Sequence, residues 1–412
     1  MQLQIAALSF ATYAHNTVER SVGSYLDRLL PGSSGDLANV LDTIQQLPLS
    51  ELSIALTSLS PDSYDAYTLA THRLVRQYQQ SAQQRLNTLR LNAAATTGDL
   101  RDAFAPGQNP VLLASAGSAE DLGGVVIRRQ QLEAARPNGL WAGGFGQWSS
   151  QDGEDGFTGF DYSPWGFAVG YDEACSEAVT LGLSAAYAST HVTLDDQRGD
   201  GDFDSYSGAA YGSWVKERLH FEGVLSYGYN DYDNRRNLVV DGTASTATSD
   251  HNGHALGTLL SGGYVWQHKQ WALEPFATLQ YSFLSENSFQ ETGAGTVSLA
   301  VADRQTHALV SELGLRLAHV FKRERFTFIP EVSAAWNYDY GIDDRAITAS
   351  FAGSPGLSFT MPGSEVEPHG LTTSAAATFL FGKGVSSSIR YNSELRENYY
   401  SHGVSGELRF SF

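Results

Sequence analysis

From Leu140 to the C-terminus, apolar residues recur at every second position, which is the period of a β-strand whose two faces meet different surroundings. In segment 325–340, Phe326, Phe328 and Trp336 fall on one face, whereas Glu331 falls on the other. Twelve segments share this pattern: 139–149, 162–173, 178–190, 203–216, 219–232, 252–267, 271–284, 304–321, 325–340, 370–381, 384–396 and 399–412. Many exceed the roughly 5–6 residues of an ordinary globular strand. Their length suits a tilted membrane crossing of about 9–11 residues with projecting ends.

The connections between these segments alternate in length. The short ones are 172–178, 216–219, 267–270, 321–325 and 382–384, and the long ones are 149–161, 191–202, 234–250, 285–303 and 341–369. Short turns on one side and long loops on the other are typical of an outer-membrane barrel. Aromatic residues also gather near the strand ends, as in a membrane-interface girdle. The sequence therefore predicts an all-β membrane protein with a 12-stranded antiparallel transmembrane β-barrel.

Composition agrees with this fold and excludes some functions. No run of 18 apolar residues occurs, so a transmembrane helix is not expected. The formal charge of −19 argues against a nucleic-acid partner, because phosphate binding needs clustered Lys and Arg. The one cysteine, Cys175, has no partner for an internal disulfide, which suits a chain that crosses an oxidising periplasm. Residues 1–14 lack the basic start of a signal peptide, so we expect the sequence to be part of a longer exported chain.

The first third of the chain has helical periodicity. Residues 16–92 predict a small helical bundle, with a helix at 37–47, a second from Ser50, and a third from Ser60-Pro61. Residues 93–118 form a linker of small residues, and 119–136 predict one more helix that ends at Pro137.

An ordered set of motifs then resembles the autotransporter β-domain family of type V secretion. These motifs are LDTIQQLPLSELSIALTSLSPDSYDAY, RLVRQYQQSAQQRLNTLR, GLWAGGFGQW, SYSGAAYGSW, ITASFAGSPGLSFTMPG and the ending YYSHGVSGELRFSF. The resemblance covers roughly residue 15 to the end. It divides the chain into a junction or passenger remnant (1–118), a lumenal plug helix (119–137) and the barrel (138–412). The Asn-Asn pair that some members use for self-cleavage is missing from the expected plug helix.

The resemblance implies a helix in the barrel lumen. Strand parity places a set of carboxylates there, because charges on the lipid face are costly. We expect these carboxylates to pair with arginines of the plug helix; the expected set is Arg128, Arg129 and Arg136 with Glu274, Glu312, Glu331, Glu394 and Glu407. A hydrated pore lining is the alternative.

The family further implies that barrel-assembly machinery reads a terminal strand ending in an aromatic residue. Leu408, Phe410 and Phe412 share one face of the last strand and form the expected assembly signal. The expected partners are therefore outer-membrane lipid, this machinery and the chain's own passenger, with the barrel as a monomer.

The predicted function is that of an outer-membrane translocator that anchors and helps export or display an N-terminal passenger at the cell surface. We expect no enzyme, cofactor or metal site in this chain: no Gly-x-Ser-x-Gly elbow occurs, and His251 and His254 lack a nearby third ligand. The triplet Arg198-Gly199-Asp200 and the alternating Asp200, Asp202 and Asp204 are explained by chance in an acidic loop, since a calcium loop would need Gly and Glu where Ser205 and Tyr211 stand. Two alternatives remain open, an outer-membrane barrel hydrolase and a surface adhesin that binds through its loops.

Overall fold

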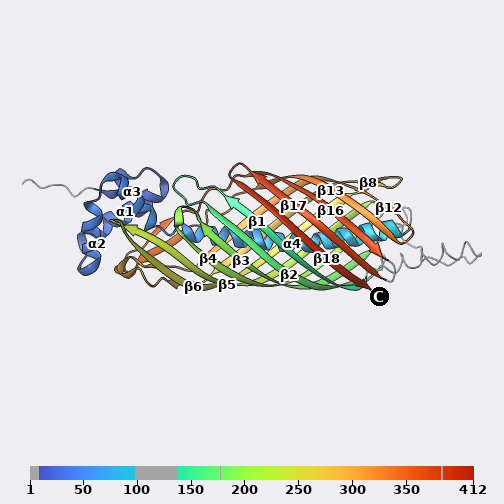
Figure 1. Ribbon diagram of the computed structural model, residues 1–412, viewed down its shortest axis with the longest axis horizontal. Coiled ribbons are helices and arrows are strands. Elements are labelled where there is room, and N and C mark those ends of the chain that lie inside the picture. The colour runs from blue at the N-terminus through green and yellow to red at the C-terminus, as the bar shows by residue number, and fades with distance from the viewer. Residues whose placement is uncertain (1–8, 98–137, 177, 382–383) are drawn as a thin grey trace, which may run out of the picture.

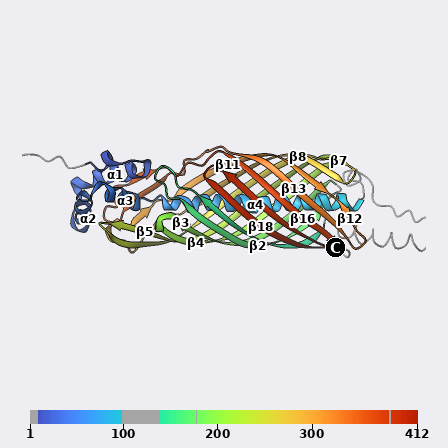
Figure 2. The same cartoon turned by 45° about the horizontal axis from the view of Figure 1, so that its top comes forward.

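A computed structural model describes residues 9–97, 138–176, 178–381 and 384–412. The chain forms a long β-barrel with a helix along its axis and a helical cap at one end (Figure 1). Turning the molecule by 45° leaves the helix enclosed by strands, so it lies inside the barrel (Figure 2).

The barrel is closed and antiparallel, with twelve strands, which confirms the predicted fold class. Each strand pairs with its sequence neighbours, and β1 pairs with β18 to close the cylinder. Its strands are β1 (Gly139–Gln151), β2 (Phe160–Ala174), β3 (Val179–Leu194), β4 (Gly199–Lys216), β5 (Leu219–Val240), β6 (Thr243–Tyr264), β8 (Trp271–Glu286), β11 (Arg304–His319), β13 (Phe326–Asp339), β16 (His369–Phe381), β17 (Val385–Arg396) and β18 (Tyr399–Ser411). Two short strands, β7 (Trp266–His268) and β12 (Phe321–Lys322), extend the edges of β8 and β13.

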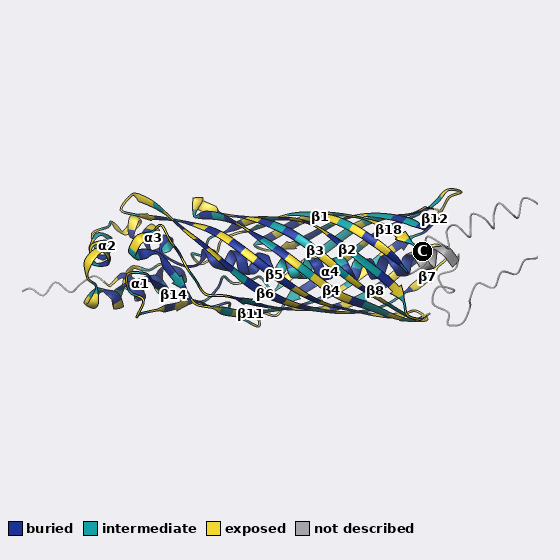
Figure 3. Ribbon diagram, turned by 90° about the horizontal axis from the view of Figure 1, so that it is seen from below, coloured by how far each residue is buried: buried dark blue, intermediate teal, exposed yellow. Residues whose placement is uncertain are grey.

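The two faces of the wall differ as the sequence period predicts. Along β5, Phe221, Leu225 and Tyr227 are exposed on the outside, whereas His220 and Glu222 are buried inside. This alternation appears as bands of yellow and dark blue along the strands (Figure 3). The outer surface is therefore apolar and suited to lipid, and the inner surface is polar.

The cap lies at the end of the barrel that carries the long connections, here called the long-loop end. It contains η1 (Phe10–Tyr13), α1 (Thr17–Leu29), η2 (Leu30–Gly32), α2 (Gly35–Gln45) and α3 (Leu49–Ser58). Helix α1 begins with a reciprocal cap: the Asn16 side chain accepts from the Glu19 amide at 2.8 Å, and the Glu19 carboxylate accepts from the His15 amide at 2.8 Å.

The long connections supply a second, small sheet against which the cap packs. Its strands run in the order β15 (Phe359–Met361), β14 (Ile347–Phe351), β10 (Leu299–Val301) and β9 (Phe289–Gln290). Short 3₁₀ turns, η3 (Asp195–Gln197) and η4 (Gly295–Val297), lie in two of these connections. One apolar core joins the cap, this sheet and the mouth of the barrel.

Helix α4 (Ser63–Thr97) leaves the cap and runs through the lumen. The prediction that all of residues 16–92 form a bundle in front of the barrel is therefore wrong for this helix. Helical spacing showed that the segment is a helix, but its many Gln, Arg and Thr side chains reflect a polar lumen rather than a solvent-exposed bundle face. The predicted plug helix, 119–137, lies outside the described residues.

Candidate functional site

The lumen and its helix form the candidate functional site. Helix α4 starts among the long connections, where Tyr64 donates a hydrogen bond to Glu291 at 2.7 Å. It approaches the opposite end, here the short-turn end, at Arg90, which contacts strands β5 and β8. At about 1.5 Å per residue, a helix of 35 residues is about 52 Å long, so α4 spans the whole barrel.

Near the long-loop end, α4 is fastened by short polar contacts. The Asp65 carboxylate accepts from Arg345 at 2.9 Å and from the Ser364 amide at 2.8 Å. One turn further, Thr68 donates to Glu286 at 2.8 Å, and His72 contacts Ser282 and Thr306 at 2.7 and 2.9 Å. Each of these partners comes from the wall or from a long connection. These contacts therefore hold the first turns of the helix in the mouth of the barrel.

In the middle of the barrel, helix arginines meet wall carboxylates. Arg76 pairs with Glu394, and Gln80 donates to Glu312 at 3.0 Å. Arg85, whose side chain is fully buried, contacts Asp172 at 2.9 Å and Glu407 at 2.5 Å.

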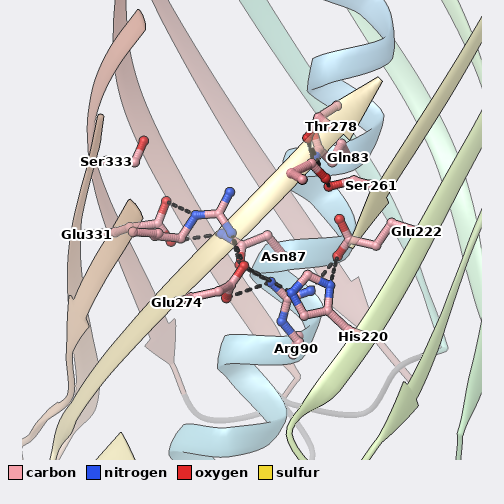
Figure 4. Close-up of polar contacts among 12 residues, drawn as sticks. Gln83, Asn87, Arg90, His220, Glu222, Ser261, Glu274, Thr278, Glu331 and Ser333 are labelled. Atoms are coloured by element: carbon pink, nitrogen blue, oxygen red, sulfur yellow. Dashed lines mark hydrogen bonds and ion pairs between the residues drawn. The ribbon is translucent and has the colours of Figure 1, made fainter. Parts of the chain in front are cut away.

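Near the short-turn end lies a larger network (Figure 4). Arg90 pairs with Glu222 and with Glu274 at 2.9 Å, and Glu274 also accepts from Arg316 and His220. Asn87 donates to Glu331 at 2.8 Å, while Arg390 reaches Glu331 from the wall at 2.9 Å. Because buried charges are costly unless paired, this network fixes both the rotation and the depth of the helix.

Another face of α4 is apolar and packs against one side of the barrel wall. Tyr78, Ala82 and Leu86 pack against a cluster of Trp141, Ala168, Ala209, Tyr211, Val224 and Leu259. Leu91 joins a second apolar cluster at the short-turn end, with Val265, Ala272, Ala318, Val320, Ile329 and Leu380. The apolar core under the cap closes the opposite mouth.

Small cavities remain beside the helix, both near the long-loop end and on the side of β1, β17 and β18. One, of about 50 Å³, lies between α4 and β1, β17 and β18, and a second of about 60 Å³ continues it past Arg85 and Glu407. Since about 10–15 Å³ of such space is enough for one water molecule, each cavity holds a few waters. Among the described residues, α4 is the helix that occupies the lumen.

The structure brings the predicted carboxylates together around one helix. Glu274, Glu312, Glu331, Glu394 and Glu407 all face the lumen and all contact α4 side chains. The expected helix partners, Arg128, Arg129 and Arg136, lie outside the described residues. In the described part of the chain, the helix arginines that meet these carboxylates are Arg76, Arg85 and Arg90 of α4.

Sequence reasoning missed these three arginines because it assigned their helix to a bundle in front of the barrel. A signal was present: Arg76, Gln80, Gln83, Asn87 and Arg90 recur at alternating steps of four and three residues. Such a stripe marks one continuous polar face over four turns of helix. A polar stripe of this length, opposite the apolar Tyr78, Ala82 and Leu86, indicates a helix between a charged surface and an apolar one.

The other residues singled out in the sequence lie on the outside. Leu408, Phe410 and Phe412 are exposed on the outer face of the terminal strand, beside β1. Asp200 and Asp202 lie near Arg235 and His191 at 3.6 and 2.8 Å, in surface ion pairs. His251 is buried against Tyr232, whereas His254 faces outward, so these two histidines point to opposite sides of the wall.

Comparisons with known proteins agree with this architecture. The model of the Autotransporter beta-domain family matches residues 140–392. The translocator domain of the autotransporter NalP from Neisseria meningitidis superposes with a TM-score of 0.53 at 18% identity, covering 71% of this chain and 95% of that one.

Two curated relatives extend the comparison. An extracellular serine protease of Serratia marcescens is 24% identical over 68% of this chain, and the esterase EstA of Pseudomonas aeruginosa is 25% identical over 56%. The chain spans only 26% and 36% of the length of these relatives. The matched family, the closed barrel and its apolar outer face together show that this chain belongs to the autotransporter β-domain family and is an outer-membrane translocator.

Proposed function

We propose that this chain is a translocator in its closed state after export, with α4 as the tether between a surface-exposed passenger and the barrel. The observation that carries the proposal is the direction of α4. Its first turn lies among the long connections, which face the cell surface in outer-membrane barrels, and its last turns lie at the periplasmic turns. A passenger joined to the N-terminal side of the cap would therefore emerge outside the cell.

The cap serves as the outer seal in this proposal. It packs on the long connections through one apolar core, outside the lumen that α4 occupies. The cap must therefore fold on the barrel after the chain ahead of it has crossed. The named activities of the two relatives, a protease and an esterase, suggest that any catalysis belongs to a passenger rather than to the barrel.

Cysteine labelling tests this orientation. Cys175 is the free cysteine of the chain and is exposed at a short turn, so an impermeant maleimide should not reach it in intact cells. In a Cys175→Ala background, Ser24→Cys on the exposed side of α1 should label fully in intact cells. Labelling of Cys175 without permeabilisation, or protection of the cap cysteine, would reverse the orientation and remove the proposal.

We further propose that barrel-assembly machinery reads the terminal strand through Leu408, Phe410 and Phe412. These side chains are exposed in the folded barrel, so a Ser in place of Phe412 removes little packing. We expect Phe412→Ser to lower outer-membrane levels at least several-fold. The matched control is Leu140→Ser, equally exposed on the neighbouring strand β1. Equal losses in both variants would show that lipid exposure matters and that the terminal position does not.

A further inference from the structure

Four histidines on the outer face of the barrel occupy equivalent positions. His254, His307, His369 and His402 each lie on the second strand of a hairpin that is joined at the long-loop end. Each begins a tripeptide of His, a small residue and an aliphatic residue: His254-Ala255-Leu256, His307-Ala308-Leu309, His369-Gly370-Leu371 and His402-Gly403-Val404. The repeat lies in strands that differ widely in the rest of their sequence, so strand propensity does not explain it.

The contact made by each histidine is also the same. Its Nδ1 atom meets an aromatic donor group diagonally across the hairpin: Tyr227 at 2.8 Å, Tyr281 at 2.8 Å, Trp336 at 3.2 Å and Tyr391 at 2.6 Å, in the same order. In every case the aliphatic residue of the tripeptide lies directly opposite this aromatic residue in the strand register.

A second aromatic ring fixes the orientation of each imidazole. The centroids of Tyr229, Phe283, Tyr338 and Tyr400 lie 5.4, 5.1, 5.1 and 5.9 Å from those of the four imidazoles, again in the same order. Each imidazole therefore lies between two aromatic side chains, and its Nδ1 atom is already engaged in a hydrogen bond.

The Trp336 pair determines which nitrogen carries the proton. An indole N–H is only a donor, so Nδ1 of His369 must accept and the neutral ring carries its hydrogen on Nε2. A tyrosine hydroxyl can donate to Nδ1 in the same way, and in that tautomer Nε2–H is the free donor of the other three rings. Among the described residues, the structure records no polar partner for these Nε2 atoms.

His254 lies where the apolar outer surface gives way to a polar one. Below His254 on the outer face lie the exposed Leu256 and Leu260, and above it lie Asn252 and Asp250. Because the other three histidines occupy the equivalent hairpin position, all four side chains fall near this level, which corresponds to the lipid headgroups of the outer leaflet.

The β3–β4 hairpin of the long-loop end differs. On β3 and β4, His191 is occupied by Asp202 at 2.8 Å, and Tyr187 donates to Asp204 at 2.9 Å, so carboxylates stand where the other hairpins offer N–H groups. The histidines thus form an arc from β6 through β18, and the acidic β3–β4 surface lies outside it.

We propose that this histidine arc binds the phosphoryl groups of phosphorylated glycolipid in the outer leaflet. Oriented N–H donors at headgroup height suit anionic oxygen acceptors, and the aromatic and aliphatic side chains beneath them suit the acyl chains. The inference rests on the outer-membrane location of the barrel and does not depend on the proposed passenger.

Lipid retention by the purified full chain tests the proposal. Barrels reconstituted with bisphosphorylated lipid A, or with the same lipid dephosphorylated, are re-extracted in mild detergent, and bound lipid is counted by native mass spectrometry. We expect several-fold more retained lipid when phosphate is present. Equal retention of the two lipids by the unmodified chain would overturn the proposal without any variant.

A set of variants then locates the site. Replacing His254, His307, His369 and His402 with Phe keeps the ring and the apolar surface but removes the N–H donors, so the phosphate-dependent excess should disappear. The matched control is His319→Phe, which alters an outer-face histidine beside Trp271 at the short-turn end and should keep the excess. Heat-dependent gel mobility confirms folding of each variant. An undiminished excess in the folded quadruple variant, or an equal loss in the control, would overturn the assignment to the arc.

Discussion

The cap and helix α4 both belong to the N-terminal part of the chain, but different forces hold them to the barrel. The cap helices bury Val18, Val22, Leu26 and Leu56 in one apolar core with the long connections. Beyond its first turns, α4 is held mainly by arginines and amides that meet wall carboxylates.

This difference follows from how the two regions reach their places. Apolar burial is non-directional, so a cap can fold on the barrel mouth from several approaches. Buried ion pairs require defined geometry and are costly when one partner is missing, so α4 fits the lumen at one depth and rotation. The cap should therefore be separable from the barrel, whereas α4 should not.

The largest effect should come from reversing a helix charge. Arg85→Glu would place a third carboxylate beside Asp172 and Glu407, and loss of one buried partner alone costs about 3–5 kcal/mol. We expect α4 to leave the lumen or the barrel to unfold at a clearly lower temperature. Gel mobility after heating measures barrel stability, and planar-bilayer conductance measures whether the lumen has opened.

The matched control for this variant is Arg20→Glu, the same change at an exposed position of α1. Unchanged mobility and conductance in Arg85→Glu would show that the buried pairs do not hold the helix.

A smaller effect, confined to the cap, should follow from Leu56→Ala. Leu56 is fully buried, and truncation of a buried leucine costs about 2–5 kcal/mol. Limited proteolysis should cut the cap faster, while the heat-dependent mobility of the barrel stays the same. Ile54→Ala, at an exposed position of the same helix, should leave both measurements unchanged. If Leu56→Ala lowers barrel stability as well, the cap and the barrel unfold together and the distinction drawn here fails.

Acid should also loosen the mouth of the barrel. Burial acts to raise the pKa of the Glu291 carboxyl, but its contacts with Arg236 at 2.7 Å outweigh burial and hold that pKa below its ordinary value of 4.5. A pKa lowered by folding contributes stability above the unfolded value, and this stability is lost as pH falls through the folded pKa.

Proteolysis of the cap should therefore accelerate as pH falls below 4.5, when measured with a protease active across that range. Glu291→Gln should make the cap more susceptible at neutral pH and flatten part of this acid response. An identical pH profile in the variant would exclude Glu291 as a source of the acid sensitivity.

The smallest effect should come from Tyr25→Phe in the cap. The Tyr25 hydroxyl donates to the Leu357 carbonyl at 2.9 Å and accepts from the Phe351 amide at 3.0 Å. Phe keeps the stacked contact with Phe359 at 4.4 Å, so the loss should be about 1–2 kcal/mol. A modest rise in cap proteolysis is expected, well below that of Leu56→Ala, and a loss as large as that of Leu56→Ala would mean that hydrogen bonds rather than apolar burial hold the cap.

The sequence by itself determined the barrel. A period of two recurs from Leu140 to Phe412, so one face of each strand meets lipid and the other face meets the lumen. The segments between the connections give the number of strands, and the alternation of short and long connections gives their direction. The same parity placed Glu274 and Glu331 inside, because the choice between two faces is a local property of each strand.

The tertiary structure alone decided which helix fills the lumen. Helical spacing identifies a helix and its polar positions, but side chains such as Arg76, Arg85 and Arg90 fit water as well as they fit buried carboxylates. Only the closed barrel brings Glu394, Glu407 and Glu274 within reach of those arginines, from strands that lie far from α4 in the sequence. Electrostatic pairing depends on distance in space, and that distance is set by closure of the barrel rather than by any local pattern.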